Sequence, residues 1–197
     1  MGKRKIFFGL FLGALVCLGF TCDRIHIENG NGYIVLPPDT TTVEPELPIR
    51  EQLIKTFRSQ IGVRQTNGNT GPEIDMYLAS VGLGPGYPWC GAFMSWGYQE
   101  HNLSVPETGA WTPSWFIDGR VIPNNQAQLG DVGGLYFSNL GRIAHIMVFD
   151  ENWSDAGNLI ITVEGNTNDT GSREGDGVYR KRRSKNQIHR VANWIDG

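Results

Sequence analysis

The spacing of apolar residues predicts helices in the first half of the chain and strands in the second. Apolar side chains recur at helical spacing in three segments, residues 53–62, 72–82 and 90–99, each with a glycine or a proline at or beside one end. Five later runs have the length and composition of strands: Val132–Phe137, Ile143–Phe149, Leu159–Glu164, Gly177–Arg182 and Ile188–Trp194. Helices followed by consecutive antiparallel strands predict an α+β fold, in which the helix that begins at Cys90 packs on a sheet of about five strands.

The first 48 residues are expected to lie outside this domain. Basic residues at positions 3–5 precede an uncharged apolar run from Ile6 to Phe20, which is the pattern of a signal peptide at residues 1–22. Cys22 follows the run and is expected to carry lipid, although the residues before it match the usual lipobox imperfectly and Cys17 is a competing site. Residues 23–48, rich in proline and threonine without periodicity, predict a disordered tether. We therefore expect an exported lipoprotein, anchored to the membrane in the cell envelope, with one domain at residues 49–197.

The charge of the mature chain argues against a nucleic-acid-binding protein. Three of the 17 basic residues belong to the signal peptide, which leaves 14 basic against 20 acidic residues and a net charge of −6. A nucleic-acid-binding protein would present a basic face. The four consecutive basic residues at 180–183 are interpreted as a solvated strand end, with contact to an anionic polymer as the alternative.

Cys90 is the strongest candidate for chemistry. It is the only cysteine beyond residue 22, and it follows Pro88 and Trp89 at the start of an apolar helix. A helix N-terminus presents amide groups without helical partners and the positive end of the macrodipole, and both favour the thiolate that attacks carbonyl groups. One alternative is a buried structural cysteine, and another is a disulfide between Cys22 and Cys90.

Four histidines are available as a base for this thiol. His26 lies in the tether, and His101 lies 11 residues beyond Cys90 on the same helix. That spacing is about 16 Å along the helix axis, too far for proton transfer. His189 in the last predicted strand stays possible. His145 is favoured because it interrupts an otherwise uncharged strand, where a polar side chain is either a hydrogen-bonded core residue or part of a site.

A carboxylate and an amide end the strand that follows His145. Glu164, Gly165 and Asn166 come directly after the apolar run Leu159–Val163. Strand side chains alternate, so Glu164 and Asn166 point to the same side if the chain stays extended. Consecutive strands are usually neighbours in a sheet, so these side chains are candidates to orient the imidazole of His145. The alternative is that the segment simply begins a polar turn.

In this order, Cys90, His145, Glu164 and Asn166 resemble the catalytic residues of the CHAP family, the cysteine, histidine-dependent amidohydrolases and peptidases. The likeness covers roughly residues 50–195 and includes a Gly-Asp turn into the first strand. The segment from Thr70 to Cys90 is also similar to cell-wall lysins of this type. The resemblance implies the papain-like fold of the NlpC-type cell-wall hydrolase superfamily. It also implies hydrolysis of peptidoglycan, either as an N-acetylmuramoyl-L-alanine amidase or as a peptide endopeptidase.

The resemblance implies a role for each residue of the set. Cys90 would attack the amide carbonyl, His145 would transfer the proton, and Glu164 would hold the imidazole in the productive tautomer. Asn166 would either orient His145 or stabilise the oxyanion. Such a mechanism needs no metal and no cofactor, and the enzyme is expected to act on peptidoglycan as a monomer.

The chain departs from the family pattern just before the cysteine. Many members have glutamine there, where this chain has Trp89, so the usual side-chain donor to the oxyanion is missing at that position. Some members bind calcium upstream of the cysteine, but residues 84–88 contain no acidic side chain, so no calcium is expected there. Candidates to line a substrate groove are the aromatic residues Tyr87, Trp89, Trp111 and Trp115, although most of the tryptophans are expected in the core.

Two other functions are compatible with the same residues. One is a catalytically silent lipoprotein that binds the cell wall on the same scaffold. The other is an acyltransferase that uses the same cysteine and histidine. Binding alone would not need cysteine, histidine, glutamate and asparagine together, which favours an enzyme.

Overall fold

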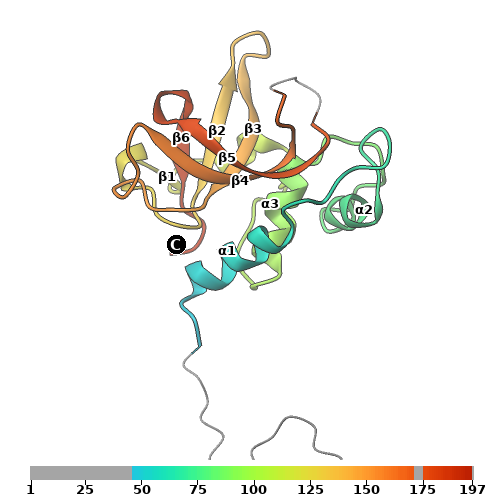
Figure 1. Cartoon of the computed structure of the whole chain (residues 1–197), viewed down its shortest axis with the longest axis horizontal. Helices are drawn as coiled ribbons and strands as arrows, with labels where there is room; N and C mark the ends of the chain where they lie inside the picture. The colour runs from blue at the N-terminus through green and yellow to red at the C-terminus, as the bar shows by residue number, and fades with distance from the viewer. Residues whose placement is uncertain (1–45, 171–174, 197) are drawn as a thin grey trace, which may run out of the picture. The chain divides into compact units, whose positions relative to one another are not determined.

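A central helix packed against an antiparallel sheet forms the framework of the domain (Figure 1). The computed structural model describes residues 46–170 and 175–196. The predicted signal peptide, the tether up to residue 45 and the lipidation site Cys22 lie outside the described residues. Within the described ranges, no helix combines the length and the apolar character needed to cross a membrane.

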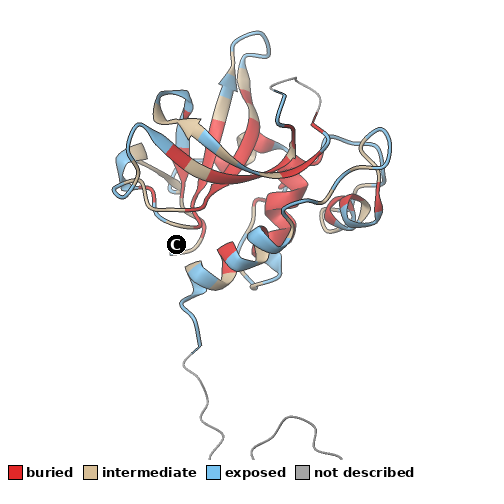
Figure 2. Ribbon diagram, in the orientation of Figure 1, coloured by how far each residue is buried: buried red, intermediate tan, exposed pale blue. Residues whose placement is uncertain are grey.

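The three helices predicted from the sequence are present: α1 (Ile49–Ser59), α2 (Pro72–Ala79) and α3 (Cys90–Gln99). Pro72 begins α2, where an amide hydrogen would have no helical partner in any case. Gly62 and Gly82 have positive φ angles of 102° and 73°, which lets the chain turn away after α1 and α2. Nearly all of α3 is buried, which explains why this helix is apolar on all sides (Figure 2).

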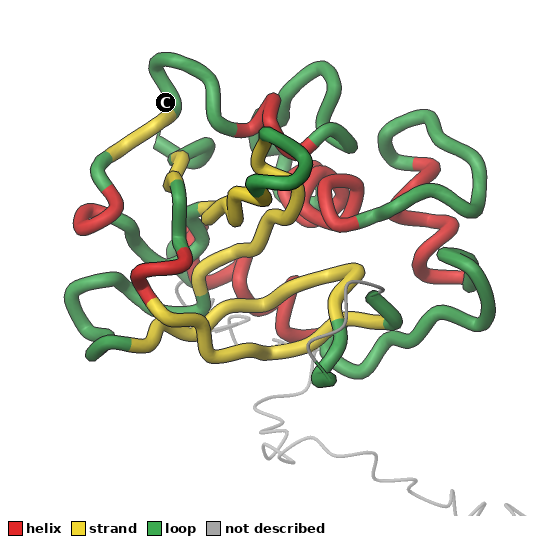
Figure 3. Tube along the Cα trace, turned by 90° about the horizontal axis from the view of Figure 1, so that it is seen from above, coloured by secondary structure: helices red, strands yellow, loops and turns green. Residues whose placement is uncertain are grey.

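The sheet has six strands, one more than the sequence predicted. The strands are β1 (Val121–Ile122), β2 (Val132–Phe137), β3 (Arg142–Phe149), β4 (Leu159–Thr167), β5 (Gly177–Ser184) and β6 (Arg190–Ala192). They pair antiparallel in the order β1-β6-β2-β3-β4-β5, so the four longest strands are adjacent (Figures 1 and 3). β1 was not predicted because two residues cannot show an alternating pattern. β6 is shorter than predicted at both ends, and at its start Ile188 still belongs to the preceding helical turn η3 (Lys185–Gln187), because its amide donates to the carbonyl oxygen of Lys185.

Apolar residues pack on both faces of the sheet. Ile146 and Val148 of β3 belong to the larger core that contains α3, whereas Met147 and Phe149 belong to a second cluster. This division follows the alternation of side chains along a strand. Phe57 of α1 lies in the larger core, where its ring is 5.1 Å from the ring of Phe93 in α3. α3 is therefore held between the other helices and the strands β3 and β4.

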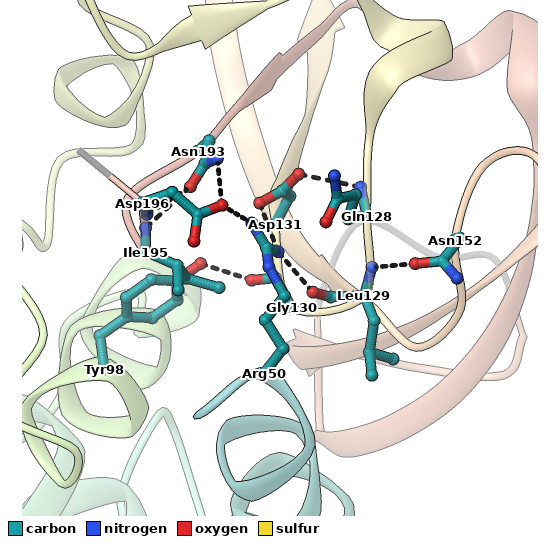
Figure 4. Close-up of polar contacts among 10 residues, drawn as sticks. All are labelled: Arg50, Tyr98, Gln128, Leu129, Gly130, Asp131, Asn152, Asn193, Ile195 and Asp196. Carbon is teal, nitrogen blue, oxygen red and sulfur yellow. Dashed lines mark hydrogen bonds and ion pairs between the residues drawn. The ribbon is translucent and has the colours of Figure 1, made fainter. Parts of the chain in front are cut away.

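A polar cluster joins α1, α3, the turn before β2 and the C-terminal segment (Figure 4). Arg50 Nη1 lies 2.9 Å from Asp131 Oδ1, and Arg50 Nη2 pairs with Asp196. Tyr98 of α3 donates its hydroxyl hydrogen to the carbonyl oxygen of Gly130 at 2.5 Å. The Asp131 side chain is fully buried, and burial raises its pKa although Arg50 opposes the shift. Arg50 is therefore expected to compensate a charge that the core would not otherwise tolerate.

Replacing Arg50 with alanine is expected to lower the free energy of unfolding by about 3–5 kcal/mol, the usual effect of leaving one member of a buried ion pair without its partner. Arg58→Ala is the matched control. Arg58 also pairs with a buried carboxylate, that of Asp150, but Arg180 pairs with the same carboxylate and would remain. Urea denaturation of both variants tests this expectation. Equal destabilisation by the two substitutions would contradict it.

Candidate active site

Cys90 is the first residue of α3, as the sequence predicted. Its thiol is free and its exposed fraction is 7%, so the sulfur is nearly buried but still reaches a cavity. The first helical hydrogen bond runs from the amide of Phe93 to the carbonyl oxygen of Trp89, at 2.8 Å. The amides of residues 90–92 therefore have no helical partner, and they favour negative charge at the sulfur and on groups bound beside it.

His145 of β3 lies within hydrogen-bond reach of the Cys90 side chain. Its Nε2 is 2.8 Å from Glu164 Oε2. Because a carboxylate only accepts hydrogen bonds, Nε2 carries the hydrogen of this contact, which leaves Nδ1 as the ring nitrogen available to the Cys90 side chain. The structure thus brings together Cys90, His145 and Glu164, three residues from α3, β3 and β4.

Glu164 is fully buried, and its carboxylate accepts hydrogen bonds from the side chains of His145, Arg183 and Thr162. Arg183 of β5 donates from Nε at 2.7 Å and from Nη2 at 2.5 Å, and Thr162 donates its hydroxyl hydrogen at 2.7 Å. Burial alone would raise the pKa of Glu164, but the hydrogen bonds from Arg183 and His145 hold it well below its usual range. Glu164 is therefore a stable anion beside the imidazole.

The same contacts favour a protonated His145. Burial works against the charged ring, but hydrogen bonds to Cys90 and Glu164 and the negative charge of Glu164 raise the pKa of His145 to about 9. A histidine with this pKa is an imidazolium at neutral pH. This places a cation beside the sulfur of Cys90. The arrangement can therefore supply a nucleophile and a proton donor at the same time.

The shifted pKa values predict how stability depends on pH. The pKa of His145 is raised from 6.5 to about 9, so its contribution is complete below pH 6.5 and disappears as the pH rises through about 9. The pKa of Glu164 is lowered from 4.5, so its contribution is complete above pH 4.5 and disappears at lower pH. Urea denaturation between pH 6.5 and 9 should show a decline that His145→Ala lacks. An equal decline in both proteins would refute this assignment.

Asn166 lines the same cavity as Cys90 and His145, but strand alternation does not place it there. The pairing of β4 with β5 is irregular between Glu164 and Thr167, and Asn166 has a φ angle of 54°. The chain is therefore not extended at this point, which was the condition for expecting Glu164 and Asn166 on one side. Nor does the segment begin a turn, because β4 continues to Thr167.

Gly165 is explained by the helix that carries Cys90. A Cβ atom at this position would lie 2.6 Å from the ring of Phe93 and 2.7 Å from the ring of Trp89. A side chain would therefore push β4 away from α3. The absence of one lets the strand that bears Glu164 approach the helix that bears Cys90.

The cavity beside these residues has a volume of about 440 Å³. Besides the candidate catalytic groups, its walls contain three basic side chains, those of Arg142, Lys181 and Arg183. Its other lining residues include Asn69, Pro88, Leu135, Phe137, Leu140, Thr167 and Asn168. Within the described ranges, no group of three or more histidine, cysteine, aspartate or glutamate side chains is arranged to hold a metal ion.

Two of the four aromatic candidates for a substrate groove are core residues. Trp89 and Trp115 have no exposed surface, and the indole of Trp115 donates to the carbonyl oxygen of Gly109. The prediction of a substrate contact is therefore wrong for both. Tyr87 and Trp111 are 54% and 51% exposed, but neither belongs to the cavity wall. Trp111 lies next to that wall, because its ring stacks on Arg142.

The other described histidines lie away from the cavity. His101 Nε2 is 2.8 Å from the hydroxyl of Thr56 in α1, as expected for a residue near the far end of α3. His189 is exposed and stacks against Tyr136, with 4.8 Å between ring centroids. Neither residue lines the cavity that contains Cys90.

Arg183 and Thr162, which donate hydrogen bonds to Glu164, are among the members of the site that sequence reasoning missed. Arg183 belongs to the basic run interpreted as a solvated strand end. Side chains alternate along a strand, so the residues of this run could have been divided between two faces of β5. In the structure Lys181 and Arg183 are partly buried, whereas Arg180 and Arg182 are exposed. Similarly, Thr162 lies two residues before Glu164, on the same side of β4. Alternating positions within a charged run can thus have different functions.

No protein-family model matches this chain, and no match to it was found among curated proteins.

Proposed function

We propose that this protein is a cysteine-dependent amide hydrolase that cleaves peptidoglycan. The observation that carries the proposal is the contact of Cys90 with His145, whose second ring nitrogen is bound to the buried Glu164. A nucleophile, a base and a group that orients the base, in this order, are the arrangement used in covalent acyl transfer. If Cys90 were only a structural residue, its neighbour His145 would not need the buried Glu164 carboxylate, which Arg183 and Thr162 hold in place with three hydrogen bonds.

The first step is attack of the Cys90 sulfur on the amide carbonyl carbon. The C–N bond then breaks while His145 gives its proton to the departing amine, which leaves a thioester on Cys90. His145, now neutral, takes a proton from water, and the hydroxide formed attacks the thioester and releases the acid. Proton transfer by a positioned group contributes about 10²–10⁴ to the rate. Glu164 stabilises the imidazolium that is present before the first transfer and forms again in the second.

The developing oxyanion has two candidate donors. One is the amide of Cys90, which lacks a helical partner, and the other is the side chain of Asn166 in the cavity wall. Trp89 occupies the position where many CHAP proteins have glutamine. Its indole is fully buried, and the Nε1 hydrogen has no acceptor among the described residues. Asn166 therefore takes the place of the missing side-chain donor in our proposal. One such donor typically contributes about 2.7–4 kcal/mol.

Peptidoglycan is proposed as the substrate on three grounds. The ordered motifs resemble the CHAP family, the N-terminus predicts export to the cell envelope, and the cavity is lined by cations suited to the acidic stem peptides of the wall. The α+β arrangement, with a cysteine on a helix facing a histidine on a strand, also supports a papain-like fold. A lipid on Cys22 would hold the enzyme at the membrane, with the tether reaching towards the wall.

The test is digestion of purified peptidoglycan with the wild-type protein and with Cys90→Ala, followed by mass spectrometry of the released fragments. The wild type should generate a new amine and a new carboxylate at one type of bond. Cleavage between muramic acid and L-alanine would identify an amidase, and cleavage within the stem or cross-bridge would identify an endopeptidase. Binding without cleavage would favour the silent wall-binding protein, and fragments joined to a new amine would favour an acyltransferase.

A further inference from the structure

The cavity beside Cys90 carries uncompensated positive charge. Its described lining residues include Arg142, Lys181 and Arg183 but no aspartate or glutamate. Arg183 is neutralised by Glu164, which lies behind the wall. No ion pair joins Arg142 or Lys181 to an acidic residue within the described ranges. Two cationic side chains therefore remain beside a site that would act on a peptide.

Lys181 and Arg142 differ in how far their donors are already engaged. The ammonium group of Lys181 donates to the main-chain carbonyl oxygen of Asn168. Arg142 uses only Nη1, which donates to the carbonyl oxygen of Ile143 at 3.2 Å. Its Nε and Nη2 hydrogens have no partner among the described residues. Arg142 is therefore the better candidate to bind an anion from the substrate.

Arg142 is also held in place. The guanidinium carbon lies 4.2 Å from the centroid of the Trp111 ring, a cation–π contact. The hydroxyl of Thr112, next to Trp111, donates to the same Ile143 carbonyl oxygen at 2.8 Å, which ties this segment to β3. Stacking fixes the plane of the guanidinium while leaving its edge free. A planar edge with two parallel N–H donors matches a carboxylate.

We propose that Arg142 binds a carboxylate of the substrate peptide, so that the enzyme selects stem peptides with a free carboxyl group over the same peptides with that group amidated. The inference rests on the proposed function for the identity of the peptide, but the binding preference can be measured without catalysis. Trp111 is a positioning residue in this account, because it acts through the guanidinium of Arg142.

The experiment compares muropeptides whose D-glutamate α-carboxyl and terminal carboxyl groups are each free or amidated. For the wild type, kcat/KM should be about 10- to 100-fold higher for the preferred free carboxylate, the range expected for hydrogen bonds between charged groups. Arg142→Ala should lose most of this ratio. Arg142→Lys should retain only part of it, because lysine keeps the positive charge but lacks the two parallel N–H donors of the guanidinium. Trp111→Phe should keep more of the ratio than Trp111→Ala, because phenylalanine preserves the stacked face.

Arg182→Ala is the control for charge alone. Arg182 is exposed on the same strand as Lys181 and lies outside the cavity wall, so its removal changes the net charge of the protein equally. The ratio should stay at the wild-type value in this variant. An equal loss in Arg182→Ala and Arg142→Ala would overturn the proposal, because general attraction to an anionic peptide would then explain the preference. A wild type without any preference would also overturn it.

A binding measurement separates this inference from the proposed hydrolysis. Calorimetric titration of Cys90→Ala with the same pairs of muropeptides needs no turnover. Tighter binding of the free carboxylate that disappears in the Cys90→Ala, Arg142→Ala double variant supports the inference even if no wall bond is cleaved. Cleavage with no such difference in binding or in kcat/KM would leave the hydrolase proposal intact and refute the role of Arg142.

Discussion

Replacing Cys90 with alanine or serine is expected to reduce peptidoglycan cleavage by a factor on the order of 10⁶, the loss seen when the nucleophile of a catalytic triad is removed. Alanine has no nucleophile, and the serine hydroxyl does not form the anion that a thiol forms beside an imidazolium. Both side chains fit the space of the thiol, so the fold should be retained. Release of labelled fragments from purified cell walls measures the loss, and circular dichroism checks the fold.

The reactivity of the thiol gives an independent measurement. Iodoacetamide should label Cys90 rapidly at neutral pH in the wild type and more slowly in His145→Ala, because cysteines beside a cationic histidine are more reactive than isolated ones. Wild-type cleavage by a folded Cys90→Ala variant would rule out the nucleophile. Slow labelling of the wild type would instead favour a buried structural cysteine.

The second large effect is expected at His145, with a smaller effect at Glu164. His145→Ala removes the proton donor and should abolish nearly all activity. Glu164→Gln should retain more, because an amide oxygen can still accept from Nε2 but cannot stabilise the charge of the ring. Activity in His145→Ala equal to the wild type would exclude His145 and direct attention to His189, although His189 lies outside the cavity.

A second substitution at Arg183 separates the effect of Glu164→Gln on activity from its effect on stability. In Glu164→Gln, the guanidinium of Arg183 loses its counter-ion and faces the amide, so the variant should also be less stable. Adding Arg183→Met removes that unpaired charge and should recover stability. Activity should stay low in the double variant if the carboxylate stabilises the imidazolium. Recovery of activity together with stability would show that Glu164 serves only to support the fold.

The sequence was sufficient to predict the elements that bear the site. α3 begins at Cys90 because Pro88 ends the preceding turn and an uninterrupted apolar segment follows, and both features are local. β3 and β4 were predicted from their apolar runs, and their adjacency followed from their order along the chain. The pairing of His145 with Glu164 could therefore be anticipated before any coordinates.

Other features depend on contacts that a linear pattern does not encode. The irregular pairing at Asn166 turns its side chain independently of strand alternation. Arg142 is the first residue of β3 and has no local feature that points to a site, because the ring that positions it belongs to Trp111, 31 residues earlier. Trp115 and Trp111 lie four residues apart, yet one is fully buried and the other half exposed. Spacing alone could not separate a core aromatic residue from one beside the cavity.

The most direct test of the account is digestion of purified peptidoglycan in water enriched in ¹⁸O. If Cys90 forms a thioester that water then cleaves, each new carboxylate should carry one ¹⁸O atom from the solvent and each cut should leave one new amine. Cys90→Ala should produce neither. Cleavage by Cys90→Ala at the wild-type rate, or no new amine and carboxylate pair with the wild type, would contradict the proposal that Cys90 hydrolyses an amide bond of the wall.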